Sequence, residues 1–352
     1  MDRLGVSERL DRLTSWQADW SGLLVVVLGL GPLGFSVVDT LAELGARVTV
    51  LAAGGADEYR DLVRVVGAAL IDAEGVDAAR ALRDASADVV IATPPYGPAH
   101  PAIVAALESG TPIWSDVEVA WRVRDKHGEP ASWLLVTGSD APGAPRREQT
   151  ALLAASMLAT SGRRVLPAGD RVPLLDAIRR PERVDHIIAE VSSRQLAWTG
   201  LSAAGRPRPT ASLCLSVGSR PIGWHESFDD FRAALGRVYA DTELACVYSR
   251  ADLATRELVE DADVRDGCRA IGVGLGVPGP SDLGIVDELI VDRAFLDDRR
   301  HRAQELATRD ELALIGISEP APVLEFIAAA ALARAVGVEP EHVLRGAAEL
   351  RS

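Results

Sequence analysis

The sequence is nearly devoid of two residue types on which phosphate chemistry often depends. Lys126 is the only lysine among the 352 residues, and asparagine does not occur. Lysine supplies the positive point charge of many phosphate-binding loops. A mechanism that needs a lysine at any other position, or an asparagine anywhere, is therefore excluded.

Cysteine is scarce as well, and acidic residues outnumber basic ones. Cys214, Cys246 and Cys268 have no metal-ligand spacing, so we expect reduced core residues rather than disulfide partners. The net charge of −14 argues against nucleic-acid binding. The early apolar run at residues 23–30 is too short to span a bilayer, and the N-terminus lacks a signal-peptide layout. We expect a cytoplasmic protein without a membrane span.

Apolar strand patterns alternate with helical patterns along the chain, which predicts an α/β protein of two domains. Residues 1–128 are predicted to form a Rossmann-like domain with a parallel sheet. The polar run at residues 124–130 is typical of a linker. Residues 129–352 are predicted to form a second α/β domain of the phosphate-loop type.

The first predicted domain contains a glycine-rich turn between a strand and a helix. The strand covers residues 23–28, and the turn that follows has the pattern G-x-G-x-x-G, formed by Gly29, Leu30, Gly31, Pro32, Leu33 and Gly34. Such a turn lets the backbone approach a phosphate at a helix N-terminus. A dinucleotide site also needs an acid after the second strand, but residues 52–55 there are Ala-Ala-Gly-Gly. A nicotinamide oxidoreductase is therefore only an alternative.

The second predicted domain opens on a strand, a glycine turn and an apolar helix at residues 133–158. This order is the scaffold of a nucleotide-phosphate loop. Ala144 and Pro145, however, stand where lysine and serine or threonine are needed. The sequence thus predicts a degenerate ATP loop, in which the matching positions are Thr137, Gly138, Ser139 and Gly143.

Six segments in collinear order resemble the Mur ligases of peptidoglycan synthesis, and most of all the members that add D-glutamate. These segments are GLGPLGF (29–35), GTPIWSDVEVAWR (110–122), WLLVTG (133–138), PLLDAI (173–178), EVSSRQLAW (190–198) and AAAALARAVGV (328–338). The resemblance implies that the turn at residues 29–34 and Thr93 face a UDP-linked sugar. It also implies that Glu190 occupies a Mg²⁺-binding position, and it identifies the other family-matching remnants as Ser192, Ser193, Gln195 and His225.

Several positions depart from the family pattern. Leu33 replaces a hydroxyl residue, Arg220 and Pro221 replace an aspartate and a metal-binding histidine, and Leu235 replaces a carbamylated lysine. Tyr248 stands where the family has an adenine-binding asparagine. The family's third domain, which grips glutamate and closes over ATP, is expected to be absent.

These departures lead to a main hypothesis and two alternatives. The main hypothesis is an inactive member, without a metal site, that keeps a binding or partner role in cell-wall precursor metabolism. The first alternative is an active ligase, completed by a partner or with a site rebuilt around Arg146 and Arg147, and it would need ATP and Mg²⁺. The oxidoreductase is the second. Expected ligands are UDP-N-acetylmuramoyl-L-alanine or another UDP-sugar. A homo-oligomer or protein partner is expected on the apolar helix at residues 323–336.

Overall fold

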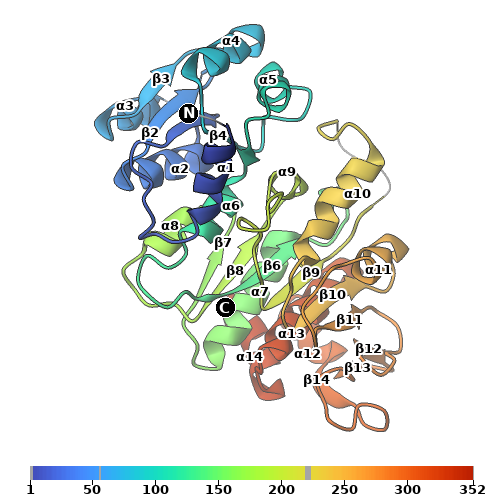
Figure 1. Cartoon of the computed structure of the whole chain (residues 1–352). Coiled ribbons are helices and arrows are strands. Elements are labelled where there is room, and N and C mark those ends of the chain that lie inside the picture. Colours follow the sequence, from blue (N-terminus) through green and yellow to red (C-terminus); the bar gives the residue numbers. More distant parts are fainter. Residues whose placement is uncertain (1–2, 55–56, 219–222, 352) are drawn as a thin grey trace.

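The computed structural model describes residues 3–54, 57–218 and 223–351, and it contains two sheets with helices around both (Figure 1). The first sheet is entirely parallel, with the strand order β3-β2-β1-β4-β5. Its strands are β1 (Leu24–Leu28), β2 (Arg47–Leu51), β3 (Ala69–Ile71), β4 (Val89–Ala92) and β5 (Ile113–Trp114). The helices of this half are α1 (Arg3–Arg12), α2 (Pro32–Glu43), α3 (Asp57–Val65), α4 (Gly75–Ala85), α5 (Pro101–Ser109) and α6 (Asp116–Arg122). The predicted α/β class with a Rossmann-like first sheet is confirmed.

The second sheet has the strand order β14-β13-β12-β11-β10-β9-β6-β8-β7. It is parallel from β7 to β12, and the last two strands add an antiparallel edge. The strands are β6 (Ser132–Thr137), β7 (Val165–Ala168), β8 (His186–Glu190), β9 (Ala211–Cys214), β10 (Ala245–Ser249), β11 (Arg269–Val273), β12 (Asp282–Val286), β13 (Leu289–Asp292) and β14 (Gln304–Thr308). The helices are α7 (Arg147–Thr160), α8 (Leu174–Arg179), α9 (Ser193–Ala197), α10 (Phe228–Gly236) with the 3₁₀ turn η1 (Arg237–Tyr239), α11 (Leu253–Glu260), α12 (Arg309–Leu314), α13 (Pro320–Ala335) and α14 (Pro340–Arg351).

The two halves share an apolar core and a polar seam. Trp121 of α6 packs edge-on against Trp133 of β6, with ring centroids 5.2 Å apart. On the seam, Arg179 of α8 forms ion pairs with Asp39 and Glu43 of α2. The predicted boundary between residues 128 and 129 falls between α6 and β6. Because helices from both halves meet here, the ends of the two sheets are held close together.

The position of helix α13 contradicts the expectation of an exposed apolar helix at residues 323–336. It was predicted to offer an apolar docking surface, but Phe326, Ile327 and Leu332 are fully buried. The helix packs against α7, α14 and strands β9 to β12, and Figure 1 shows it behind the second sheet. A helix that is apolar all round is typical of such an enclosed position. Because these apolar side chains of α13 are buried, they cannot form the expected surface for self-association.

Candidate functional site

The glycine turn after β1 is fixed by contacts with its own neighbours. Gly29 has φ of +102°, and a Cβ placed on it would lie 2.3 Å from the Thr93 Oγ1 atom. A Cβ on Gly34 would lie 2.3 Å from the Gly29 carbonyl oxygen. Side chains cannot be accommodated at these distances, so the close fold of the turn requires glycine at both positions. Gly31 differs, because nothing lies within 4 Å of its hypothetical Cβ.

This turn borders a cavity of about 410 Å³ at the carboxyl ends of β1 and β4. The strand order reverses between these two strands, which is where ligands of open parallel sheets bind. All the residues predicted on the UDP side line the cavity: Gly29, Leu30, Gly31, Pro32, Leu33, Gly34 and Thr93. The Thr93 hydroxyl, however, donates to the Leu28 carbonyl at 2.7 Å. A phosphate placed here would therefore meet mainly backbone N–H groups.

The cavity is also lined by residues outside the predicted set, and Tyr96 and Asp170 are two of them. Tyr96 lies beside Gly29, and Asp170 reaches the cavity from the loop after β7. Asp170 also lines a second cavity of about 170 Å³, together with Glu148 and Glu190. The two cavities thus meet at Asp170. Only the folded arrangement of both halves reveals this, because the loop after β7 is distant from the glycine turn in sequence.

The second glycine turn follows β6 and leads into α7. The Thr137 hydroxyl donates to the Val191 carbonyl at 2.7 Å, and the Ser139 N–H donates to the Ser216 carbonyl at 2.8 Å. Gly143 is exposed, with φ of +81°. Three of the predicted loop residues (Thr137, Gly138 and Ser139) are thus buried in the sheet end, whereas the rest of the loop projects outward.

Arg147 fills the inner side of this loop. Only 8% of its side chain is exposed, and its Nη1 atom donates to the Gly138 carbonyl at 2.9 Å. The same guanidinium forms ion pairs with Asp140 of the loop and with Glu190 at the end of β8. Burial raises the pKa of Glu190, whereas the charge of Arg147 opposes this rise. The loop therefore holds a cation already, and that cation is neutralised by two carboxylates.

A carboxylate also occupies the N-terminus of α7. Glu325 of α13 is 1% exposed, and its Oε1 accepts the Arg146 backbone N–H at 2.8 Å. In nucleotide loops, the first N–H groups of this helix bind phosphate. A phosphate group at this position would have to displace Glu325. Sequence reasoning could not find this contact, because the two residues are 179 positions apart.

The family-matching residues after β8 hold the two halves together. Ser192 and Gln195 form a capping box at the start of α9. The Gln195 side-chain amide also donates to both carboxylate oxygens of Asp116, at 3.0 and 3.2 Å. Asp116 is buried at the start of α6, and its desolvation raises its pKa to about 6. Ser193 lies 2.9 Å from the His225 Nε2 atom.

The part of the chain that the structure describes does not assemble a metal site. Within the described ranges, no group of three or more His, Cys, Asp or Glu side chains could hold a metal ion. Glu190, the expected Mg²⁺ position, is paired with Arg147. Leu235, a residue of α10, is fully buried and offers no ligand. Arg220 and Pro221 lie outside the described residues.

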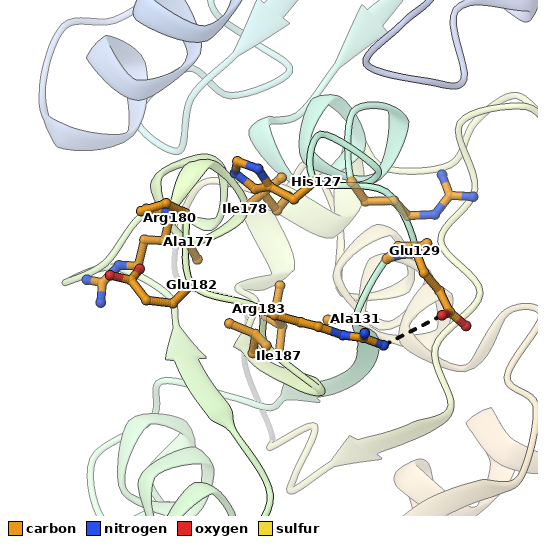
Figure 2. Close-up of a pocket in the computed structure, with 13 residues that line it drawn as sticks. His127, Glu129, Ala131, Ala177, Ile178, Arg180, Glu182, Arg183 and Ile187 are labelled. Carbon is orange, nitrogen blue, oxygen red and sulfur yellow. Dashed lines mark ion pairs between the residues drawn. The ribbon is translucent and has the colours of Figure 1, made fainter.

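A third cavity, of about 350 Å³, lies between the linker and the loop before β8 (Figure 2). Figure 2 shows Arg183 extending across it toward Glu129, with which it forms an ion pair at 3.7 Å. Both of these side chains are well exposed. None of the predicted site residues lines this cavity, so it is a feature of the linker and separate from both turns.

Comparisons with known proteins place the chain among ligases. No family model matches it. It is 46% identical over 341 residues to the UDP-N-acetylmuramoylalanine–D-glutamate ligase of Leifsonia xyli subsp. xyli, covering 95% of this chain and 65% of that protein. The Tropheryma whipplei (strain Twist) ligase of the same name is 36% identical, with 96% and 68% covered. The corresponding Streptomyces avermitilis ligase is 39% identical, with 93% and 67% covered. The chain thus spans about two thirds of the length of these relatives.

Solved structures agree on the fold. A ligase from Neisseria meningitides that acts on UDP-N-acetylmuramate matches with a TM-score of 0.54 at 13% identity, covering 93% of this chain and 97% of that chain. A murein peptide ligase from Psychrobacter arcticus matches with a TM-score of 0.50 at 11% identity, covering 93% of this chain and 68% of that chain.

Among the described residues, no helix combines the length and the apolar character that a membrane crossing requires. The relatives favour the active-ligase alternative over the hypothesis of an inactive member. The chain belongs to the Mur ligase family, and the relatives compared above are UDP-N-acetylmuramoylalanine–D-glutamate ligases.

Proposed function

We propose that this protein acts in the cytoplasm as a ligase that joins D-glutamate to UDP-N-acetylmuramoylalanine. The proposal rests on the cavity at the glycine turn after β1. All seven residues that were predicted to face the UDP group contribute to the lining of this cavity. The similarity to ligases, which extends over both halves of the chain, supports the same reaction.

In this proposal, the backbone binds the diphosphate of the precursor. Leu33 offers no hydroxyl, and Pro32 at the start of α2 offers no N–H. The remaining N–H groups of the turn and of the first turn of α2 supply the hydrogen bonds, helped by the helix dipole. The sugar end of the precursor then extends past Asp170, which lines both cavities. Its acyl group is thereby directed toward Glu190 and Arg147.

On the nucleotide side, Arg147 supplies the positive charge that a lysine supplies in other phosphate loops. A guanidinium binds phosphate oxygens through two parallel N–H donors, so it can neutralise developing charge. Because Glu190 is already paired, we assign no step to a metal ion. Asp140 and Glu325 must leave their present partners before phosphates can contact Arg147 and the N-terminus of α7.

A second candidate function is supported by those same contacts. If Asp140, Glu190 and Glu325 stay in place, the loop is permanently occupied by the protein's own charges. The chain would then bind the UDP-linked precursor without ligating it. The two candidates share the precursor site and differ only at the loop after β6.

The deciding experiment measures ADP release by the purified chain with UDP-N-acetylmuramoylalanine, D-glutamate and ATP–Mg²⁺. The ligase proposal expects ADP release that requires both the precursor and D-glutamate, with the dipeptide product detected by mass spectrometry. Thermal unfolding with each compound alone runs in parallel. Stabilisation by the precursor without ADP release would favour the second candidate. Stabilisation by NADH alone would overturn both and support the oxidoreductase alternative.

A further inference from the structure

Two of the three thiols lie in contact, one on β10 and the other just before β11, and neither proposed site uses them. Cys246 is the second residue of β10, and Cys268 directly precedes β11. Their Sγ atoms are 3.7 Å apart, close enough for either thiol to hydrogen-bond the other. The third thiol, Cys214 on β9, is fully buried, and its Sγ atom contacts the Ser216 carbonyl.

The two thiols differ in exposure. Cys246 is 1% exposed and belongs to the same core cluster as Leu258 and Tyr239. Cys268 is partly exposed, in the turn that leads into β11. We therefore expect an oxidant in solution to react with Cys268 before Cys246.

The contact also sets which sulfur ionises first. The hydrogen bond from the Cys246 thiol stabilises the Cys268 thiolate, which lowers the pKa of Cys268, and the backbone N–H of Arg269 contributes to this effect. The same hydrogen bond and burial raise the pKa of Cys246. A reactive thiolate that is accessible and lies next to a second thiol is the arrangement found in oxidation-sensitive cysteine pairs.

We propose that Cys268 and Cys246 form a site of reversible thiol oxidation that hydroperoxides convert to an intramolecular disulfide. In the first step, the Cys268 thiolate attacks a peroxide oxygen. The O–O bond breaks, a sulfenic acid forms on Cys268, and hydroxide leaves and takes a proton from solvent. In the second step, the Cys246 sulfur attacks the Cys268 sulfur, the S–O bond breaks, and the hydroxyl leaves as water with the proton of Cys246. Two thiols and one hydrogen peroxide thus give one disulfide and two waters.

The required movement is small. A disulfide holds its sulfurs about 2.05 Å apart, so the two sulfurs must approach by roughly 1.7 Å. Cys268 lies two positions before Ala270, the residue that pairs with Cys246, so the movement falls on the segment just before the β10–β11 ladder, which begins at the pair Ala245 and Arg269. The new bond would close a loop that contains α11.

That loop also supports the loop after β6. Asp252, which caps α11, accepts the backbone N–H groups of Val217 and Gly218 at 2.7 and 3.2 Å. The adjacent Ser216 accepts the Ser139 N–H. The disulfide would therefore constrain the segment behind the candidate nucleotide loop, and its formation does not depend on which proposed function holds.

The test treats the full native chain with hydrogen peroxide, unfolds it, blocks the remaining thiols and measures the intact mass and the peptides. We expect the loss of two of the three thiols, a mass decrease of about 2 Da before blocking, a Cys246–Cys268 peptide pair, and reversal by a dithiol reductant. The oxidised chain should also melt at a higher temperature than the reduced one. Cys214→Ser is the matched control and should behave like the wild type.

Two variants separate the roles of the sulfurs. Cys246→Ser should trap oxygenated Cys268, seen as a gain of about 16 or 32 Da, because no partner thiol remains. Cys268→Ser should leave Cys246 reduced, since it is buried. The proposal is overturned if the wild type accumulates oxygenated Cys268 instead of the disulfide, if the pair stays reduced while other sites oxidise, or if the linkage forms only between chains.

Discussion

The Arg147 Nε atom lies 3.3 Å from the Glu190 Oε1 atom, and both side chains are almost withdrawn from solvent, with 8% and 13% exposed. This pair joins the start of α7 to the end of β8, at the place where the family resemblance implied a bound metal ion. A fixed guanidinium thus stands beside the carboxylate that a mobile cation was expected to occupy. The loop after β6 is a charged, internally paired structure even without any ligand.

Removing Arg147 should destabilise the protein. Arg147→Met leaves Glu190, which is 13% exposed, without this counter-charge, and removing one partner of such a buried pair typically costs about 3–5 kcal/mol in the free energy of unfolding. Urea unfolding at pH 7 measures the loss. The double variant Arg147→Met/Glu190→Gln should recover most of it, because no uncompensated charge remains. Arg171→Met, which removes an arginine that is 84% exposed, serves as the control and should change little. Equal losses in the single and double variants would contradict the pairing.

Replacing Asp140 should strengthen phosphate binding. Asp140→Asn removes the exposed carboxylate that competes for Arg147, and an ion pair of this kind is worth about 1 kcal/mol, or roughly five-fold in affinity. Titration calorimetry with inorganic tripolyphosphate in magnesium-free buffer measures the change. Glu148→Gln makes the same change in net charge, but Glu148 pairs with Arg171 instead. If both variants gain equally, the effect is one of overall charge and the competition at Arg147 is refuted.

Asp116 should give the protein a pH-dependent stability. Its pKa in the folded state is raised to about 6, mainly by burial. The folded state therefore binds this proton more tightly than the unfolded chain, so ionised Asp116 lowers stability at pH 7, and stability recovers as the pH falls through 6 toward 4. Asp116→Asn, which can keep the hydrogen bond from Gln195, should be about 2–3 kcal/mol more stable than the wild type at pH 7. The difference should vanish near pH 4. Parallel pH profiles of the two proteins would show that Asp116 does not titrate in this way.

Gly31→Ala should weaken the binding of a UDP-linked precursor without harming the fold. The new methyl group meets no protein atom within 4 Å, so it projects into open space in the turn that lines the cavity. A misplaced methyl group in a fitted site costs roughly ten-fold or more in affinity. Thermal unfolding without ligand should match the wild type, while the shift with UDP-N-acetylmuramoylalanine should shrink. Gly276→Ala is the control, because its Cβ also meets nothing within 4 Å and it lies outside the cavity. An undiminished shift in Gly31→Ala would remove the turn from the proposed site.

Local patterns in the sequence were good guides to local structure. The G-x-G-x-x-G turn between a strand and a helix, and the strand, glycine turn and helix at residues 133–158, both follow from neighbouring residues. The contacts that define the candidate site do not. Glu325 reaches the start of α7 from the far end of the chain, and Gln195 reaches Asp116 across the seam. Such contacts depend on how helices pack over the sheets, for which one sequence carries no periodic signal.

The packing around the two glycine turns determines how readily the sequence of each turn can change during evolution. At the first turn, a side chain on Gly34 would strike the Gly29 carbonyl and one on Gly29 would strike Thr93. A single replacement there must be accompanied by a second change, which rarely arises at the same time. At the second turn, Pro142 and Gly143 are exposed. The φ of +81° at Gly143 still favours glycine, but no neighbouring atom lies within 4 Å of a hypothetical Cβ there. Replacements can accumulate there one by one without loss of the fold, so a chain of this architecture can lose its phosphate-loop lysine while its first turn keeps Gly29 and Gly34.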